Sequence, residues 1–564
     1  MSKSISKNKK EIKIENFIKL YERSCVENWD LPALTDYVSG TTLTYGKMAS
    51  LIAEIHLFFE SNGVKPGSKI AICGKDSTRW VVIYMATVTY GAVIVPILSE
   101  FNPVDVAHIV NHSEAEILFI DEHIFEHIDP EKLLNVKGVM PISDHTRVLF
   151  EKDGSDFSNN LRLIRRRFRR RYPDGFASKD VKFADRDNSE VVEINYTSGT
   201  TGFSKGVMLT GENLAGNVCF GLDTVLHFRS SRALAFLPLA HAYGCAFDML
   251  TPLAAGSHVT LLGKTPSPRV LIKALAEVKP HLVICVPLIL EKIYKNQILP
   301  LISKGTMRWT LAVPFLDNLI YAKIRKKLVD VFGGEFEEVI VGGAPLNHEV
   351  EEFLHKIKFP FTVGYGMTEC GPLISYTPWR EFIVGSSGRT LPIMETKIDS
   401  PDPENIPGEI CVKGTNVMKG YYKNPDATKA VFDKDGWLHT GDMGTRSSDG
   451  TLFLRGRSKT MILSASGQNI YPEEIEAKLN NMPFVAESLV VERDGKLVGL
   501  VYPDYEALDR IGVAGADADA TMEKIRQELN KLVAPYERLT KITLLPHEFE
   551  KTPKRSIKRF LYTQ

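Results

Sequence analysis

The sequence predicts an α/β protein: a large N-terminal domain of stacked α/β subdomains, a small β-barrel-like subdomain, and a small α+β C-terminal lid. Three observations lead to this fold class. Apolar runs of strand length alternate with helical patterns over residues 69–121, which is typical of a sheet covered by helices. Residues 388–454 change to shorter strand-like pieces separated by turns. A chain of 564 residues is too long for one hydrophobic core, so we expect two or more domains.

The first part of the chain predicts a mostly parallel sheet with helices on its faces. A polar lead-in and a helix over 14–26 come first, and a strand–helix unit begins at Leu43. The elements that follow alternate in type: strand 69–73, helix 80–90, strand 92–96, helix 104–111 and strand 117–120. Regular alternation of this kind is the pattern of parallel strands joined by crossover helices.

The segment that organises the predicted site is Tyr-Thr-Ser-Gly-Thr-Thr-Gly-Phe-Ser-Lys-Gly, residues 196–206. It follows an apolar run at 191–196 that predicts a buried strand. Its hydroxyl groups, its glycines, which let the backbone approach a ligand, and the cation of Lys205 are suited to binding polyphosphate. The alternative is a flexible linker, but linkers rarely follow a buried strand and lead into a second apolar run.

This loop differs from the two commonest nucleotide-binding loops. A Walker A loop counted from Gly199 requires glycine where Ser204 stands. A dinucleotide fingerprint that begins at Gly364 has Glu369 in place of its third glycine. Residues 196–206 are therefore interpreted as a phosphate-binding loop of another kind.

Strand ends after this loop carry glycine, hydroxyl, aromatic or histidine residues. They occur at 239–244, 342–345 and 364–369. Helices are expected at 212–220 and 288–296. Strands are expected at 233–238, 259–262 and 282–287, and two more begin at 338 and at 361. Because ligands of open α/β sheets bind at the carboxyl ends of the strands, we expect these segments to form the walls of one site.

Composition argues against several classes of protein. The 69 basic and 69 acidic residues give a formal net charge of zero, so no nucleic-acid binding through bulk charge is expected. Seven scattered cysteines without a Cys-x-x-Cys pair indicate a reducing compartment, rather than disulfides or zinc. The first ten residues contain no apolar core of a signal peptide, and no apolar run reaches 18 residues. We therefore expect a cytoplasmic protein without a transmembrane segment.

Residues 161–172, Leu-Arg-Leu-Ile-Arg-Arg-Arg-Phe-Arg-Arg-Arg-Tyr, contain seven arginines. One interpretation is a solvated surface helix or loop. The other is a patch that attracts anionic lipid head groups or polyanions, in which the apolar residues between the arginines allow shallow burial. The second interpretation predicts peripheral contact with anionic membranes.

These motifs, in this order, resemble the adenylate-forming (AMP-binding) superfamily of acyl-CoA synthetases, luciferases and peptide-synthetase adenylation domains. The resemblance covers residues 40–560. Within the superfamily, Asp-Gly-Trp-Leu-His-Thr-Gly-Asp at 435–442 is similar to the fatty acyl-CoA synthetase signature, and 286–294 is similar to the long-chain branch. The resemblance implies that ATP and Mg²⁺ convert a fatty acid to an acyl-adenylate, from which coenzyme A takes the acyl group.

The resemblance also implies a role for individual residues around the nucleotide. The loop from Thr197 to Lys205 would hold the departing phosphates, with Thr200 catalytic and the other contacts at Ser198, Gly199, Thr201 and Gly202. Glu369 would ligate Mg²⁺, and Thr368 would contact the α-phosphate. The adenine would be enclosed by Gly343, Ala344, Pro345, Gly366 and the stacked ring of Tyr365. Asp442 and Arg457 would bind the ribose hydroxyls.

Further roles concern the acyl and CoA sides. His241 would separate the carboxylate pocket from the phosphates, while Tyr243 and Phe236 fit core or tunnel wall. Lys459 would be the hinge between an N-terminal domain at 1–457, with its β-rich part at 388–456, and a mobile lid at 458–564. Gly467 would lie against the pantetheine arm. The structural alternatives are a turn-forming Asp442, a helix-start Glu369 and a structural His241.

One position departs from the family pattern. The C-terminal segment Lys-Thr-Pro-Lys-Arg-Ser-Ile-Lys-Arg, 551–559, places Ser556 where the family has the lysine that serves adenylation. A hydroxyl cannot replace a cation opposite developing phosphate charge. Either Lys554 or Lys558, which share a face with residue 556 in an extended segment, supplies the cation, or adenylation is slow, or the protein binds nucleotide without turnover.

Three hypotheses for function follow. The first is a long-chain fatty acid–CoA ligase. The second is a ligase that loads an acyl carrier protein or activates an aryl carboxylate. The third is a non-catalytic protein that binds acyl-AMP or ATP, and the serine at 556 is its main support.

Overall fold

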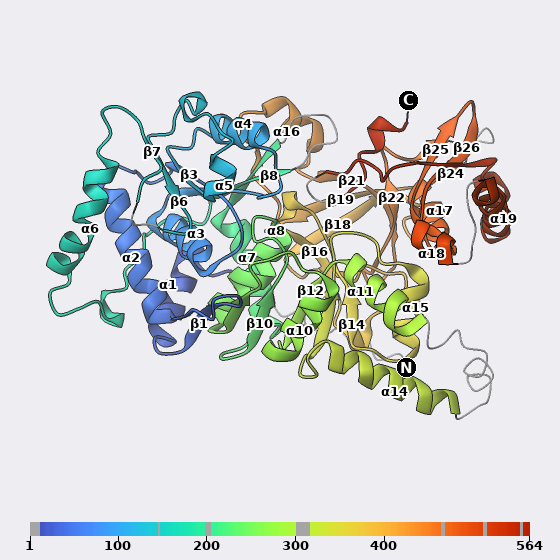
Figure 1. Ribbon diagram of the computed structural model, residues 1–564, viewed down its shortest axis with the longest axis horizontal. Coiled ribbons are helices and arrows are strands. Elements are labelled where there is room, and N and C mark those ends of the chain that lie inside the picture. Colours follow the sequence, from blue (N-terminus) through green and yellow to red (C-terminus); the bar gives the residue numbers. More distant parts are fainter. Residues whose placement is uncertain are drawn as a thin grey trace.

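Two large sheets build most of the molecule, and a smaller C-terminal part lies at one end (Figure 1). The computed structural model describes residues 12–144, 147–197, 205–299, 316–463, 468–510, 516–552 and 556–563. The seven-stranded sheet has the order β14 (Phe361–Val363), β13 (Glu338–Val341), β12 (Leu282–Cys285), β10 (Arg232–Ala235), β11 (His258–Leu261), β1 (Pro32–Asp36) and β2 (Thr42–Thr44). Its neighbouring strands are parallel except for β1 and β2.

The eight-stranded sheet carries the predicted phosphate loop. Its order is β20 (Gly420–Tyr421), β9 (Lys205–Thr210), β8 (Val191–Thr197), β4 (Val93–Ile97), β3 (Lys69–Cys73), β5 (Ile117–Ile120), β6 (Gly138–Pro141) and β7 (Phe150–Glu151). The strands from β8 to β6 pair in parallel, and the three outer pairings are antiparallel. The predicted α/β class, with its mostly parallel sheets, is confirmed.

Most predicted elements lie within a few residues of the observed ones. The helices expected at 14–26, 80–90, 104–111 and 212–220 are α1 (Phe17–Glu27), α3 (Thr78–Tyr90), α4 (Pro103–Ser113) and α7 (Gly211–Asp223). The strand expected at 233–238 was too long, because β10 ends at Ala235. Pro238 has no N–H to donate, and the N–H of Leu239 donates to the carboxylate of Asp76, so the chain leaves the sheet there.

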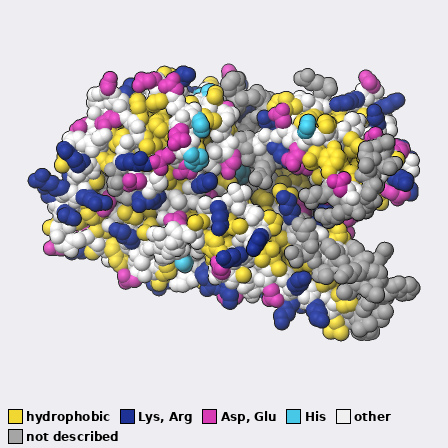
Figure 2. All heavy atoms as spheres, viewed as in Figure 1, with side chains coloured by type: hydrophobic (Ala, Val, Ile, Leu, Met, Phe, Trp, Pro, Cys, Tyr) yellow, Lys and Arg dark blue, Asp and Glu magenta, His cyan; other side chains and the backbone are white. Residues whose placement is uncertain are grey.

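The arginine-rich segment is a helix, α6 (Phe157–Arg171), which packs beside α2 (Tyr45–Ser61) at the edge of the molecule (Figure 1). Its apolar side chains face inward: Phe157, Leu161 and Ile164 are buried, and the rings of Phe157 and Phe58 lie 5.6 Å apart. Of the apolar residues expected to allow shallow burial in a membrane, Leu161 and Ile164 are therefore not available, whereas Leu163, Phe168 and Tyr172 are half-buried. Figure 2 shows Lys and Arg side chains gathered at the edge where Figure 1 places α6.

The β-rich part and the C-terminal part follow. The first contains an antiparallel sheet of β18 (Met394–Asp399), β19 (Gly408–Gly414), β21 (Leu438–Arg446) and β22 (Leu452–Arg457). The second contains β25 (Val485–Arg493), β26 (Lys496–Pro503) and β27 (Lys541–Leu544) with helices α17 (Pro472–Leu479) and α19 (Ala516–Leu532). Its apolar clusters are separate from the cluster that runs from Ile12 to Leu452. The predicted domain boundary at 457 is compatible with this separation and stays a prediction.

Among the described residues, no helix combines the length and the apolar character that crossing a membrane requires. Contact between the C-terminal part and the rest includes an ion pair of 3.6 Å between Arg455 of β22 and Glu474 of α17. It also includes the close approach of Gly456 to Tyr471 and Glu473.

The packing of α6 predicts a difference between its two faces. Phe157→Ala should lower the free energy of unfolding by about 3–5 kcal/mol, because a ring packed against Phe58 and Gly138 is lost. Arg166→Ala, on the exposed face, should change it by less than about 0.5 kcal/mol. Urea denaturation followed by circular dichroism measures both. Equal effects of the two substitutions would contradict the inward orientation of the apolar face.

Candidate active site

A cavity lies where the carboxyl ends of β10, β12, β13 and β14 lead into loops. Its walls are mainly apolar and aromatic side chains from separate elements, with glycine backbone at 342–343, 364 and 366: Leu226, Tyr243, Phe247, Ile284, Ile340, Met367, Pro372, Leu373 and Tyr376. His241 and Thr368 also line it. The expectation that these strand ends form one site is met by this arrangement.

His241 stands where the loop after β10 turns into a short helical segment, α8 (Ala242–Gly244), which continues as a π-helix, η3 (Cys245–Leu250). The imidazole Nδ1 accepts a hydrogen bond from the backbone N–H of Tyr243 at 3.3 Å. Upstream, both carboxylate oxygens of Asp76 lie 3.2 Å from the N–H of Leu239. These contacts hold the histidine at the cavity, as either a structural or a functional role requires.

The predicted ribose-binding residues meet in space and include a third partner. Asp442 of β21 and Arg457 of β22 are cross-strand neighbours, with Arg457 Nε 2.8 Å from Asp442 Oδ1. The hydroxyl of Tyr365 donates to Asp442 Oδ2 at 2.7 Å. Burial raises the pKa of the Asp442 carboxyl, and the nearby Arg457 opposes that change. Asp442 lies inside a strand, so the alternative that it forms a turn is wrong.

Glu369 is oriented by a residue that the sequence analysis did not identify. It belongs to a short 3₁₀ turn, Thr368–Cys370, and its Oε1 accepts a hydrogen bond of 2.8 Å from the hydroxyl of Tyr421. The Nζ of Lys205 lies 4.9 Å from the centre of the same tyrosine ring, a cation–π contact. Tyr421 therefore links the end of the predicted phosphate loop to the predicted metal-binding carboxylate.

The predicted phosphate loop is the connection of a β-hairpin. Thr197 ends β8 and pairs with Lys205, which begins β9. The predicted contacts between them, Ser198, Gly199, Thr200, Thr201 and Gly202, lie outside the described residues, as do Gly467 and Lys554. Packing within the hairpin also requires glycine at 206, because a Cβ there would lie 2.9 Å from Ile194.

The predicted adenine-binding segment is only partly at the cavity. Gly343, which has a left-handed backbone (φ +86°), lines the cavity, whereas Ala344 and Pro345 are exposed and are not among the lining residues. A Cβ on Gly366 would lie 2.2 Å from the carbonyl oxygen of Pro372, so the turn that carries Thr368 and Glu369 requires glycine there. Lys459 lies in an exposed turn after β22.

The described residues on either side of 553–555 pair with each other, but Lys554 lies outside the described residues, so the expectation that it shares a face with Ser556 and Lys558 stays a prediction. The N–H of Thr552 donates to the Ser556 carbonyl at 2.8 Å, and Lys551 pairs with Ile557 in a β-bridge. The described cations of this segment are ion-paired: Lys551 with Glu487 at 2.5 Å, Lys558 with Glu550 at 3.4 Å and Arg559 with Glu473 at 3.6 Å and with Glu476.

The chain is similar to known proteins over most of its length. The model of a family described as AMP-binding enzyme matches residues 21–422. The long-chain-fatty-acid–CoA ligase FadD15 of Mycobacterium bovis is 28% identical over 92% of this chain and 90% of that protein. Long chain acyl-CoA synthetase 6, peroxisomal, of Arabidopsis thaliana is 30% identical over 83% of this chain and 69% of that protein. The crystal structure of the anthranilate CoA ligase AuaEII with anthranoyl-AMP has a TM-score of 0.76 at 18% identity, and covers 97% of this chain and 96% of that one.

Asp76, which accepts hydrogen bonds from the loop that leads to His241, should make the free energy of unfolding depend on pH. Burial raises the pKa of Asp76 to about 7 from an ordinary value of 3.8. The folded protein therefore holds this proton more tightly than the unfolded chain. The contribution of Asp76 is fully present below its ordinary value and is lost as the pH rises through about 7.

We therefore expect wild type to lose stability relative to Asp76→Asn, by on the order of 2–4 kcal/mol between pH 4 and pH 8. Urea denaturation of both proteins across this range measures the difference. Curves that stay parallel at every pH would contradict the raised pKa.

Proposed function

Because the chain belongs to the AMP-binding enzymes and to their fatty acyl-CoA synthetase branch, we propose that it joins a fatty acid to coenzyme A in a reaction driven by ATP. In the first step, a carboxylate oxygen of the fatty acid attacks the α-phosphorus of ATP, and pyrophosphate leaves. In the second, the CoA sulfur attacks the acyl carbon, AMP leaves and the thiol proton passes to solvent.

One observation carries the proposal: an apolar cavity ends at polar groups next to the Tyr365–Asp442–Arg457 cluster. The lining contains aliphatic and aromatic side chains and, apart from His241, no ionisable group other than buried tyrosines. Such a cavity suits an uncharged acyl chain, and His241 and Thr368 stand where its carboxylate would emerge. In this proposal Asp442 would accept from the ribose hydroxyls, Arg457 would donate to them, and Lys205 would pair with the phosphates.

The residues around Glu369 suit a Mg²⁺–ATP complex. Mg²⁺ is bound by one or two carboxylates together with substrate phosphate oxygens, and here one carboxylate is held in place by Tyr421. When bound, Mg²⁺ would neutralise charge on the phosphates. Tyr421 orients the Glu369 carboxylate, and Lys205 beyond the tyrosine ring adds a positive charge on the phosphate side.

Two alternatives remain specific enough to test. The first alternative is an aryl carboxylate as the substrate, which the likeness to an anthranilate CoA ligase suggests. The serine at 556 and the ion pairs of its neighbours suggest the second alternative, a protein that binds acyl-AMP without forming it.

We propose instead that Lys554 supplies the cation during adenylation, because Lys551, Lys558 and Arg559 are each held by carboxylates. The lid over 458–564, with Lys459 as its hinge, would bring that segment to the cavity.

Pyrophosphate release with a panel of carboxylates, with and without CoA, tests the reaction. We expect release to depend on a fatty acid and on Mg²⁺, and to exceed release with benzoate or anthranilate. Lys554→Ala should slow it about 10²–10³-fold, as expected for loss of a group that stabilises transition-state charge. Lys558→Ala should change it less than about threefold because Lys558 is paired with Glu550.

Ser556→Lys is the complementary variant, and it should restore activity to the Lys554→Ala protein. If none of the three substitutions alters the rate, this segment is not the source of the cation. If no carboxylate in the panel supports pyrophosphate release, the non-catalytic alternative is correct.

We also propose that α6 brings the enzyme to anionic membranes, where fatty acids partition. Since its apolar face is buried against α2, the contact would be electrostatic and without insertion. Arg166, Arg167, Arg169 and Arg170 have no carboxylate partner among the described residues, whereas Arg171 pairs with Glu60 at 3.0 Å. Each basic residue near an anionic surface contributes about 1 kcal/mol.

Replacing these four arginines with glutamine should weaken binding to vesicles of phosphatidylserine and phosphatidylcholine at least tenfold at low salt. The matched control removes four charges from α14 (Leu316–Val331), as Lys323, Arg325, Lys326 and Lys327 to glutamine. This control should bind like wild type. Equal losses in the two variants, or no loss in either, would contradict a role for α6.

A further inference from the structure

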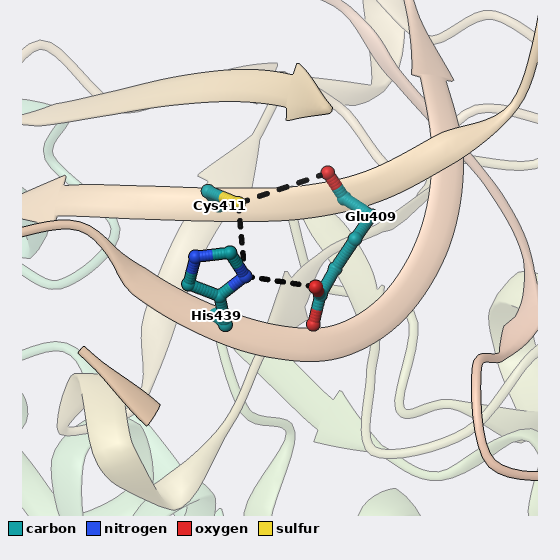
Figure 3. Close-up of side chains that lie close together, drawn as sticks. All are labelled: Glu409, Cys411 and His439. Atoms are coloured by element: carbon teal, nitrogen blue, oxygen red, sulfur yellow. Dashed lines mark hydrogen bonds and ion pairs between the residues drawn. The ribbon is translucent and has the colours of Figure 1, made fainter. Parts of the chain in front are cut away.

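Three potential metal ligands of different chemical types lie together on the small four-stranded sheet, outside the proposed active site. Glu409 and Cys411 come from β19, and His439 comes from the adjacent strand β21, where it is the cross-strand partner of Cys411. Figure 3 shows the three side chains pointing toward one another. Their ligand atoms all lie within 4.8 Å of one another.

The distances within this cluster are close to those of a tetrahedral metal site. His439 Nδ1 lies 3.6 Å from Cys411 Sγ and 2.8 Å from Glu409 Oε2. Zinc bond lengths to sulfur and nitrogen place those two ligand atoms about 3.6 Å apart, so this pair needs no movement. The nitrogen–oxygen pair, now at hydrogen-bond distance, would have to separate to about 3.3 Å, which is a small side-chain rotation.

The surroundings of the cluster favour an ion. Cys411 is buried, while the side chains of Glu409 and His439 are 27% and 32% exposed, so the donors can be reached from one side. Glu409 Oε1 accepts the N–H of Gly441 at 2.9 Å, which orients the carboxylate with Oε2 toward His439. Lys397, the cross-strand partner of Cys411 on β18, is compensated by Asp433 at 3.1 Å and lies over a tryptophan ring.

We propose that Glu409, Cys411 and His439 bind one Zn²⁺-class cation, with a fourth position open to water or another ligand. One sulfur, one nitrogen and one carboxylate oxygen form a donor set that favours such borderline metals over Mg²⁺. On binding, the Cys411 thiol proton passes to solvent and the imidazole proton moves to Nε2. The absence of a Cys-x-x-Cys pair led the sequence analysis to expect no zinc, but this cluster needs only one cysteine.

The site is independent of the proposed reaction and of Glu369. Its ion would join β19 to β21 three residues before Asp442, next to the predicted ribose-binding pair. Nothing in the proposal requires catalytic turnover, so metal binding and the ligase reaction can fail or succeed separately.

Cobalt(II) titration of the full-length protein, stripped of metal by a chelator and kept reduced with a phosphine, tests this site. We expect one equivalent to bind with a thiolate-to-cobalt charge-transfer band and the d–d bands of a four-coordinate ion, and Zn²⁺ to displace it. Cys411→Ser should remove the charge-transfer band and weaken cobalt binding at least tenfold. Cys25→Ser, a buried cysteine of α1, is the matched control and should behave like wild type. Mg²⁺ should neither produce nor displace the signal.

Glu409→Gln keeps the side-chain shape and serves as the second test if Cys411→Ser folds poorly. It should weaken cobalt binding at least tenfold while the metal-free protein keeps its circular dichroism spectrum. A charge-transfer band that persists in Cys411→Ser would overturn the site. Cobalt binding of equal strength in wild type and Glu409→Gln, or no stoichiometric binding to wild type, would also overturn it.

Discussion

The double pairing of β9, with β8 on one side and β20 on the other, is the constraint on which the candidate active site depends. Pairing with β8 closes the phosphate loop into a hairpin and brings Lys205 back beside Thr197. Pairing with β20 places Val207 opposite Tyr421. The hydroxyl of Tyr421 can then donate to Glu369 while its ring lies under the ammonium of Lys205. Backbone hydrogen bonds thus bring Lys205 close to Tyr421 and Glu369, which lie 216 and 164 residues further along the chain.

Buried carboxylates give the rest of the site its geometry. Asp76 accepts from the backbone of the loop that leads to His241. Asp442 is held between the Tyr365 hydroxyl and Arg457. Removing such groups from water is unfavourable unless each is hydrogen-bonded or paired, so the surrounding chain has little freedom to rearrange.

Much of this architecture could be predicted from the sequence, for identifiable reasons. Apolar runs such as 69–73 and 117–120 become β3 and β5 without a shift, since fully buried parallel strands leave a continuous apolar signal. The order of motifs was enough to predict that Asp442 and Arg457 belong to the same site. Tyr421 and the cavity residue Phe247 were missed, because their roles arise from strand pairing and a π-helix that no local spacing reports.

The errors have equally specific causes. The arginine run was expected to offer apolar residues to a membrane, but helical periodicity directs Leu161 and Ile164 to the face that packs into the core. The β-bridge between Lys551 and Ile557 was not predicted, because the proline and charged residues of this segment give no sign of it. Both cases depend on the partner against which a segment packs, and that partner lies elsewhere in the chain.

Transfer of isotope from the fatty acid tests the central claim, acyl-adenylate formation, most directly. The enzyme is supplied with a fatty acid labelled with ¹⁸O in its carboxylate, together with Mg²⁺–ATP and CoA, and the products are analysed by mass spectrometry. Attack of the carboxylate on the α-phosphorus predicts one ¹⁸O atom in each AMP and none in pyrophosphate. Unlabelled AMP accompanied by labelled orthophosphate or pyrophosphate would show that the carboxylate attacks another phosphorus, and would contradict the proposed chemistry.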